Sequence, residues 1–172
     1  MSFRLTNKVH LWCLVLSVII TVLLYPIFIG GLESLILSDY ILSPTKSIMI
    51  NYYIIIFLMI AFVTILHEGI HGAFYILFGG KVKFGVKKLC VYTQEISGIP
   101  INKLKFLIVL LSPAIIISLL SFIMPYSIGM SILVFNLVGC SGDFYMSFYI
   151  MRLPKKCSIV DRSYGFDIVK DI

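Results

Sequence analysis

Apolar residues fill four long stretches of the chain, and shorter polar segments separate them. These stretches cover residues 10–31, 51–79, 104–124 and 129–151. Each has the roughly 20 apolar residues that an α-helix needs to cross the hydrocarbon core of a bilayer. The pattern therefore predicts an all-α polytopic membrane protein, with four transmembrane helices in a single membrane domain that takes up residues 1–172.

Two segments outside the spans show patterns typical of strands, and in the first of them apolar and polar residues alternate. The segment KVKFGVKKLCVYTQEISGIP, residues 81–100, predicts a short β-hairpin-like loop between the second and third spans. We expect this loop either to pair its edge with an unwound substrate segment or to serve only as a topology signal. Near the end of the chain, CSIVDRSYGFDIV predicts a strand, a turn and a second strand packed against that loop.

The composition agrees with a membrane environment. Hydrophobic residues make up 60% of the chain and charged residues 13%, whereas about a quarter of an ordinary soluble domain is charged. The basic segment MSFRLTNKVH before the first span is typical of a signal peptide. The apolar run after it is longer than the ~7–15 residues of a cleavable core and ends in no A-x-A-like site, so we expect a retained anchor.

The residues that give the net charge of +6 lie mainly in alternate segments between the spans. Basic residues occupy alternate loops: Arg4, Lys8, Lys81, Lys83, Lys87, Lys88, Lys103, Lys105, Arg152, Lys155 and Lys156. This positive-inside pattern predicts a multi-pass membrane protein with both termini and the long loop in the cytoplasm. No patch mixes basic and aromatic residues, so we expect the lipid bilayer as a partner and no nucleic acid.

Four ionisable residues fall well inside the apolar stretches: His67, Glu68, His71 and Asp143. A charged residue at the centre of a membrane helix costs roughly 2.5–3.5 kcal/mol on insertion scales. No Lys or Arg lies well inside a span to neutralise the acids. A divalent metal ion would compensate for this cost.

The spacing within HEGIH, residues 67–71, supports a metal site. Residues four apart lie about 40° apart around a helix and one turn along it, so His67 and His71 can reach one ion. Glu68 completes the H-E-x-x-H motif, in which two histidines bind Zn²⁺ and the glutamate is the general base. The plainer alternative is two buried histidines hydrogen-bonded to neighbouring helices.

A catalytic zinc site needs a third protein ligand, and three residues are candidates. Leu77 occupies the third-histidine position of the elongated zincin motif, so the ligand must come from elsewhere. Asp143 is favoured because it precedes Arg152 by nine residues and His71 precedes Lys81 by ten, which predicts equal depths of roughly 14–15 Å. Glu95 and Cys140 remain the alternatives: Glu95 by its spacing from His71, Cys140 because it shares one side of the last span with Asp143.

These features together resemble the site-2 protease class of intramembrane zinc metalloproteases, and specifically a small bacterial membrane family of zincin peptidases. The resemblance rests on HEGIH, the lysine-rich segment after it, LLSPA at 110–114 and NLVGCSGD at 136–143. It covers about residues 50–160, which implies a catalytic core of three helices with the first span outside it. The resemblance also implies a multi-pass protein of a bacterial plasma membrane.

The resemblance also implies roles for individual residues. It makes His67, His71 and Asp143 the ligands of one Zn²⁺, Glu68 the catalytic base and Asn136 a substrate-positioning residue. Asn136 and Asp143 are seven residues apart and therefore share a helical face. The usual N-x-x-P…D-G pattern is altered here, because the prolines are absent and glycine precedes the aspartate.

Small residues and one proline are expected to shape this site. Gly69, Gly72, Gly139 and Gly142 flank the candidate ligands, and small residues let membrane helices approach closely. Pro113 is expected to bend the third span by removing a backbone hydrogen bond, which either opens access for water or substrate or is a simple kink.

We therefore expect a zinc-dependent intramembrane endopeptidase that cleaves a membrane protein or peptide near the cytoplasmic face. The alternative is a non-catalytic metal-binding membrane protein of an immunity or regulator type. The intact Glu68 favours the enzyme, because a purely structural metal site needs no base. Metal transport would require acids and histidines along several spans, and the first and third spans have none in their interiors.

Overall fold

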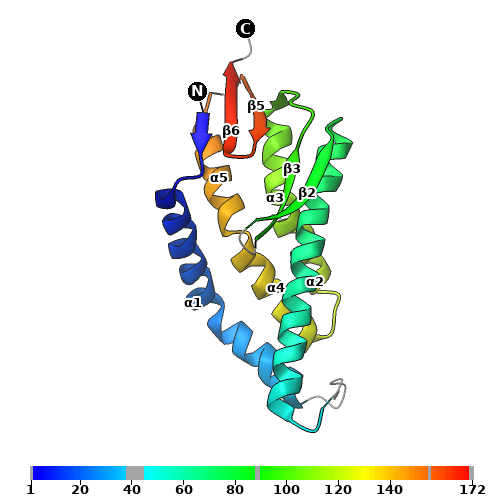
Figure 1. Cartoon of the computed structure of the whole chain (residues 1–172). Coiled ribbons are helices and arrows are strands. Elements are labelled where there is room, and N and C mark those ends of the chain that lie inside the picture. The colour runs from blue at the N-terminus through cyan, green and yellow to red at the C-terminus, as the bar shows by residue number, and fades with distance from the viewer. Residues whose placement is uncertain (1, 38–44, 88–89, 155, 171–172) are drawn as a thin grey trace.

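Figure 1 shows the computed structural model, which describes residues 2–37, 45–87, 90–154 and 156–170. Its helices are α1 (Asn7–Leu37), α2 (Ile48–Leu77), α3 (Lys103–Ser121), α4 (Tyr126–Gly139) and α5 (Ser141–Met151). The helices run lengthwise through the molecule, and the strands gather at one end. The protein is therefore mostly helical, with a small strand-bearing end.

Among the described residues, three helices are long and apolar enough to cross a membrane: α1 through Asn7–Ser34, α2 and α3. The pair α4 and α5 is a fourth candidate if the two count as one span, since they are bent by 50°. The fourth span predicted over 129–151 therefore corresponds to two helices with a bend between them and not to one straight helix. The break falls at Cys140, between Gly139 and Gly142, where glycine lowers the helix propensity of the segment.

The bend has a direct effect on Asp143. This residue lies in the first turn of α5 instead of the middle of a long helix. The positive end of the helix dipole favours a carboxylate at that position. Backbone hydrogen bonds continue across the bend, from Cys140 N to the Asn136 carbonyl and from Phe144 N to the Cys140 carbonyl.

The predicted strands are confirmed, but the prediction of an all-α protein is incomplete. Strands β2 (Val82–Lys87) and β3 (Cys90–Glu95) form the expected antiparallel hairpin, and β5 (Cys157–Arg162) and β6 (Gly165–Lys170) form the expected tail. Two further strands, β1 (Ser2–Arg4) and β4 (Ile101–Asn102), complete a four-stranded sheet in the order β1-β6-β5-β4. Strands of two or three residues are too short to show alternation, which is why the sequence pattern did not reveal them.

An aromatic and aliphatic core joins this sheet to the helices. The rings of Phe3 and Phe166 stack with centroids 4.7 Å apart, and both side chains are buried with Tyr75 and Phe106. Lys103 Nζ, at the start of α3, donates hydrogen bonds to the carbonyls of Met151 and Leu153 at the end of α5. These contacts fix α2, α3 and α5 relative to one another at the end of the molecule that carries the sheet.

The glycines beside the candidate ligands do not have the role in helix–helix contacts that the sequence predicts. In the described part of the chain, no neighbouring atom lies within 4 Å of a Cβ placed on Gly69, Gly139 or Gly142. These three therefore do not mark close helix contacts. A Cβ on Gly72 would lie 2.7 Å from Phe84 Cζ, so this glycine lets the β2–β3 hairpin, and not another helix, pack against α2.

Candidate metal centre

His67 and His71 occupy successive turns of α2 and are both buried. Their ring planes meet at 82°, and the two Nε2 atoms lie 3.1 Å apart. The i, i+4 spacing of the sequence thus turns the same edge of each imidazole toward one point.

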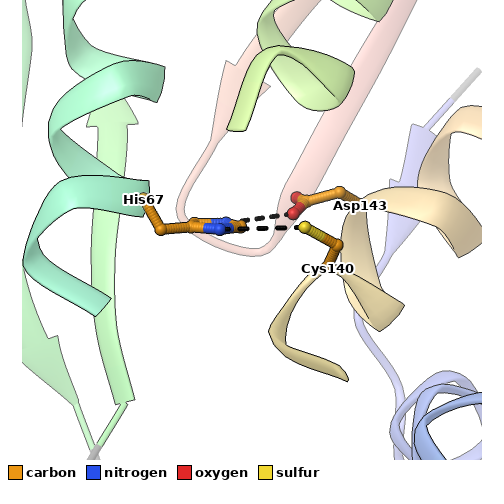
Figure 2. Close-up of side chains that lie close together, drawn as sticks. All are labelled: His67, Cys140 and Asp143. Atoms are coloured by element: carbon orange, nitrogen blue, oxygen red, sulfur yellow. Dashed lines mark hydrogen bonds and ion pairs between the residues drawn. The ribbon is translucent and has the colours of Figure 1, made fainter. Parts of the chain in front are cut away.

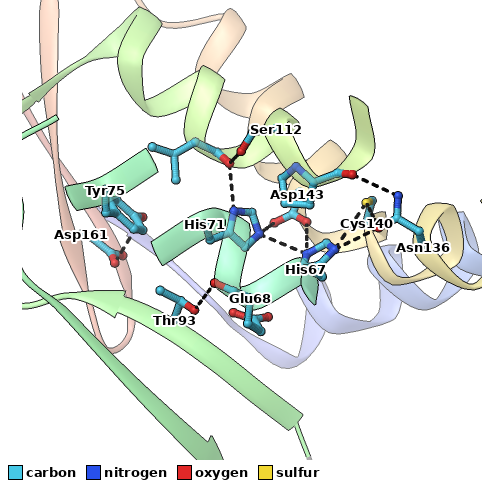
Figure 3. A network of polar contacts seen from close by, with 12 residues as sticks. His67, Glu68, His71, Tyr75, Thr93, Ser112, Asn136, Cys140, Asp143 and Asp161 are labelled. Atoms are coloured by element: carbon cyan, nitrogen blue, oxygen red, sulfur yellow. Dashed lines mark hydrogen bonds and ion pairs between the residues drawn. The ribbon is translucent and has the colours of Figure 1, made fainter. Parts of the chain in front are cut away.

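Asp143 reaches this point from α5. Its Oδ2 atom lies 3.1 Å from His67 Nε2, and its Oδ1 atom lies 3.5 Å from His71 Nε2. Figure 2 shows the approach of Asp143 to His67, and Figure 3 shows all three side chains together. The structure therefore brings the three sequence-predicted ligands together.

The contacts of the Nδ1 atoms determine which ring nitrogen of each histidine carries the proton. His71 Nδ1 lies 2.8 Å from the carbonyl oxygen of Val109. A carbonyl oxygen only accepts, so Nδ1 carries the proton and Nε2 of the neutral ring presents a lone pair. No side-chain motif in the sequence pointed to this carbonyl.

The same reasoning applies to His67 through Asn136. The amide nitrogen of Asn136 donates to the Pro113 carbonyl at 3.2 Å, which leaves Oδ1 as the atom facing His67 Nδ1 at 3.3 Å. His67 Nδ1 therefore donates, and its Nε2 also presents a lone pair. Asn136 is fully buried and orients His67; its predicted role in positioning substrate stays a prediction.

The atoms that meet at the centre are two imidazole lone pairs and a carboxylate, which are all acceptors. A single proton bridges only one pair of such atoms, whereas a metal ion contacts all three. In a tetrahedral site with Zn–N bonds of about 2.05 Å, neighbouring ligand atoms lie about 3.3 Å apart. The observed separations of 3.1 to 3.5 Å bracket that value. Two histidines and one carboxylate with an open fourth position are a ligand set of catalytic zinc.

Cys140 forms a second, looser arrangement with two of these residues. One ligand atom each of His67, Cys140 and Asp143 lies within 4.8 Å of the others. The thiol, however, approaches His67 from the Nδ1 edge, at 3.8 Å, and lies equally close to the Asn136 oxygen. Asp143 approaches the Nε2 edge, so the set with His71 is the more compact of the two.

Glu95, the other alternative ligand, is engaged elsewhere. Its buried carboxylate accepts hydrogen bonds from the backbone of Lys81, Ser97 and Gly98 and from the Ser97 hydroxyl. Burial alone raises the pKa of this carboxyl, but the hydrogen bonds outweigh burial and hold the pKa below its ordinary value. Glu95 therefore closes the base of the β2–β3 hairpin.

Asp161 is a partly buried carboxylate that the sequence analysis did not identify. Its Oδ2 atom accepts hydrogen bonds from the Glu95 amide at 2.9 Å and from the Tyr75 hydroxyl at 3.4 Å. It thus links β5, β3 and α2, one turn beyond His71 (Figure 3). Burial is the main cause that raises the pKa of Asp161 to about 6. The available sequence signal was an acid directly after the apolar pair Ile159 and Val160 of the predicted strand.

Glu68 lies at the edge of an open pocket of about 120 Å³. The pocket is also lined by Val63, Thr64, His67, Phe135, Asn136 and Gly139. Within the described residues, the Glu68 carboxylate makes no hydrogen bond or ion pair, while its backbone carbonyl accepts one from Thr93 Oγ1 at 2.9 Å. A free carboxylate beside the histidines and facing a pocket is available to exchange protons with a bound molecule.

Apolar helices with a zinc-type ligand set define the general class of a membrane-associated zincin. Residues 60–158, more than half of the chain, match the model of the family described as "Putative zincin peptidase". The chain belongs to this family. The matched segment includes the H-E-x-x-H motif and Asp143.

One relative is a protein of Pyrococcus woesei named "Uncharacterized 24.7 kDa protein in gap 5'region". It is 30% identical over 129 residues, which is 70% of this chain. The match spans 56% of that protein, so this chain corresponds to little more than half of its length. No solved structure matches the chain.

Proposed function

We propose that this protein is a site-2-protease-like intramembrane zinc endopeptidase, which hydrolyses a peptide bond of a membrane protein or peptide near the cytoplasmic face. The observation that carries the proposal is the meeting of two Nε2 atoms and the Asp143 carboxylate within 3.5 Å, next to a free Glu68 that lines a pocket. Membership of the zincin peptidase family supports the same chemistry.

Each residue of the site has a distinct role in the hydrolysis. His67, His71 and Asp143 hold Zn²⁺, which when bound supplies the Lewis acidity that acidifies a water molecule and polarises a carbonyl. Glu68 takes a proton from the attacking water on its carboxylate and later delivers it to the leaving amine. Val109 and Asn136 hold the two imidazole rings by their Nδ1–H groups, so that both Nε2 atoms stay directed at the same point.

The site also limits the form of the substrate. A pocket of about 120 Å³ admits a side chain or a short length of backbone but not a helix, which is about 10 Å across. The peptide bonds of a membrane helix are moreover shielded by its own hydrogen bonds. We therefore assign as substrate a membrane segment that is unwound where it is cut, with the lipid bilayer as the surrounding partner.

The test is to compare Glu68→Gln with the wild-type protein in lipid vesicles of defined composition. Zinc is measured by atomic emission after dialysis, and cleavage is measured by mass spectrometry of membrane peptides from cells that produce either protein. We expect Glu68→Gln to retain one zinc per chain and to cleave nothing. If this variant keeps full cleavage, Glu68 is not the base.

Two other outcomes would contradict the proposal in different ways. A wild-type protein that binds no zinc would remove the metal centre. A wild-type protein that binds zinc but yields the same peptide profile as Glu68→Gln would assign the chain to the alternative class, a metal-binding protein without catalysis.

A further inference from the structure

The carbonyl that orients His71 lies within a helix, where carbonyl oxygens are normally occupied. Each backbone N–H of an α-helix donates to the carbonyl four residues earlier. The partner of the Val109 carbonyl would therefore be the N–H of residue 113, and that residue is proline, which has none. The helix α3 nevertheless continues through Pro113 to Ser121.

Two side chains take the place of the missing N–H. His71 Nδ1 lies 2.8 Å from the Val109 oxygen, and the Ser112 hydroxyl donates to the same oxygen at 2.9 Å. A carbonyl oxygen has two lone pairs, so these two donors fill it. Val109 and Ser112 are buried, which excludes water as a competing donor.

Pro113 also holds the second histidine through its own carbonyl. That oxygen accepts a hydrogen bond from the Asn136 amide nitrogen at 3.2 Å, and the Asn136 oxygen faces His67 Nδ1. The two rings of the H-E-x-x-H motif are thus both oriented from one turn of α3 (Figure 3), although no side chain of α3 reaches the metal position.

We propose that Pro113 is a positioning residue of the metal centre: by lacking an N–H, it frees the Val109 carbonyl to bind His71 Nδ1–H and so directs the lone pair of His71 Nε2 toward the metal. This inference rests on the proposed zinc site. It replaces the expectation that Pro113 serves as a kink or an entrance, and it explains why a residue that normally costs about 3 kcal/mol inside a helix occupies a buried position here.

The substitution Pro113→Ala tests the inference because it supplies the missing N–H. The new amide donates to the Val109 carbonyl, draws it back toward the helix axis and competes with His71. We expect the affinity for Zn²⁺, measured by competition with a chromophoric chelator, to fall about 10- to 100-fold, the usual effect of losing a partner of a metal ligand. The metal-free variant should unfold at the same temperature as the wild type or higher, because alanine restores a helical hydrogen bond.

Pro26→Ala is the matched control. Pro26 also lies inside a long helix, α1, but is exposed and makes no contact with the centre. This variant should gain helix stability and keep the wild-type zinc affinity. The double substitution Ser112→Ala with Pro113→Ala removes one of the three competing donors, and should recover part of the lost affinity.

A second measurement does not depend on any variant folding. In the zinc-loaded wild-type protein, ¹⁵N NMR of labelled histidine should show a proton on His71 Nδ1 and metal on Nε2. Metal on Nδ1, or a Pro113→Ala variant that binds zinc within twofold of the wild type, would overturn the inference. Failure of the wild-type protein itself to bind zinc would instead refute the proposed function.

Discussion

Asp161 offers a quantitative test of the polar link between the hairpin and α2. The pKa of this carboxyl is raised to about 6, mainly by burial, whereas a free aspartate in an unfolded chain has a pKa of about 3.9. Between pH 4 and 6 the folded protein therefore holds a proton that the unfolded chain has released. Under these conditions the free energy of unfolding falls as the pH rises, and above pH 6 the loss is complete.

The size of the effect follows from the difference in pKa. About 2 pH units at about 1.4 kcal/mol each correspond to at most about 3 kcal/mol. Asparagine has no proton to release, and its side-chain oxygen replaces Asp161 Oδ2 as acceptor from Glu95 N and the Tyr75 hydroxyl. We therefore expect Asp161→Asn to be more stable than the wild type by about 1–3 kcal/mol at pH 7.5, and equally stable at pH 4.

The assay is thermal unfolding in detergent micelles at pH 4, 5, 6 and 7.5, followed by circular dichroism. For a chain of this size, the expected gain at pH 7.5 corresponds to about 3–9 °C. The control is Asp167→Asn: Asp167 pairs with Arg162 and Tyr164 at the surface, its pKa is lowered, and its removal should not stabilise the protein at any pH. A difference between Asp161→Asn and wild type that stays constant from pH 4 to 7.5 would refute the reasoning.

Further substitutions separate the candidate ligands from their neighbours. Asp143→Asn should reduce the affinity for zinc by at least about 100-fold, whereas Cys140→Ala should retain it within about threefold, because the thiol faces the Nδ1 edge of His67. Equilibrium dialysis against ⁶⁵Zn distinguishes the two variants, and the reverse order of affinities would make Cys140 the third ligand in place of Asp143. Glu95→Gln should keep one zinc per chain but lower the free energy of unfolding by about 2–3 kcal/mol in denaturant titrations. The reason is that the charge-assisted hydrogen bond from Gly98 N–H to Glu95 Oε2 is replaced by two donors that face each other, Gly98 N–H and the amide nitrogen of the new glutamine. Loss of zinc with unchanged stability would contradict this prediction. Gly139→Val should fill the pocket beside Glu68 and reduce cleavage at least about 10-fold without loss of zinc, because no neighbouring atom clashes with the new side chain. Unchanged cleavage in a peptidomics comparison would show that the substrate does not use this pocket.

The sequence predicted those features that repeat along the chain or rest on a fixed spacing. The hairpin could be read from alternation, the tail strands from the turn-like residues between two short apolar runs, and the pair His67 and His71 from the helical period. The convergence of Asp143 on the histidines matches the depth argument, although the break at Cys140 was not foreseen. The membrane side of the termini, the domain boundaries and the surrounding partners stay predictions.

The remaining features depend on contacts between distant segments. Strand β1 exists because β6 offers it an edge, and nothing in Ser2–Arg4 itself predicts a strand. The Val109 carbonyl carries no side-chain signal, and its role is visible only once Pro113 and His71 are seen on neighbouring helices. Three of the four glycines that we expected at helix contacts make none among the described residues, because composition does not say which face of a helix meets a neighbour.

The pairing of β1 with β6 sets an order for the assembly of the molecule. Phe3 is synthesised before all five helices, yet its stacking partner Phe166 is synthesised after them. The nascent chain must therefore leave β1 unpaired until these helices have been made. The four-stranded sheet beside α2, α3 and α5 is completed only when β6 pairs with β1, so the contacts of this sheet with the helices around the centre form late and not helix by helix.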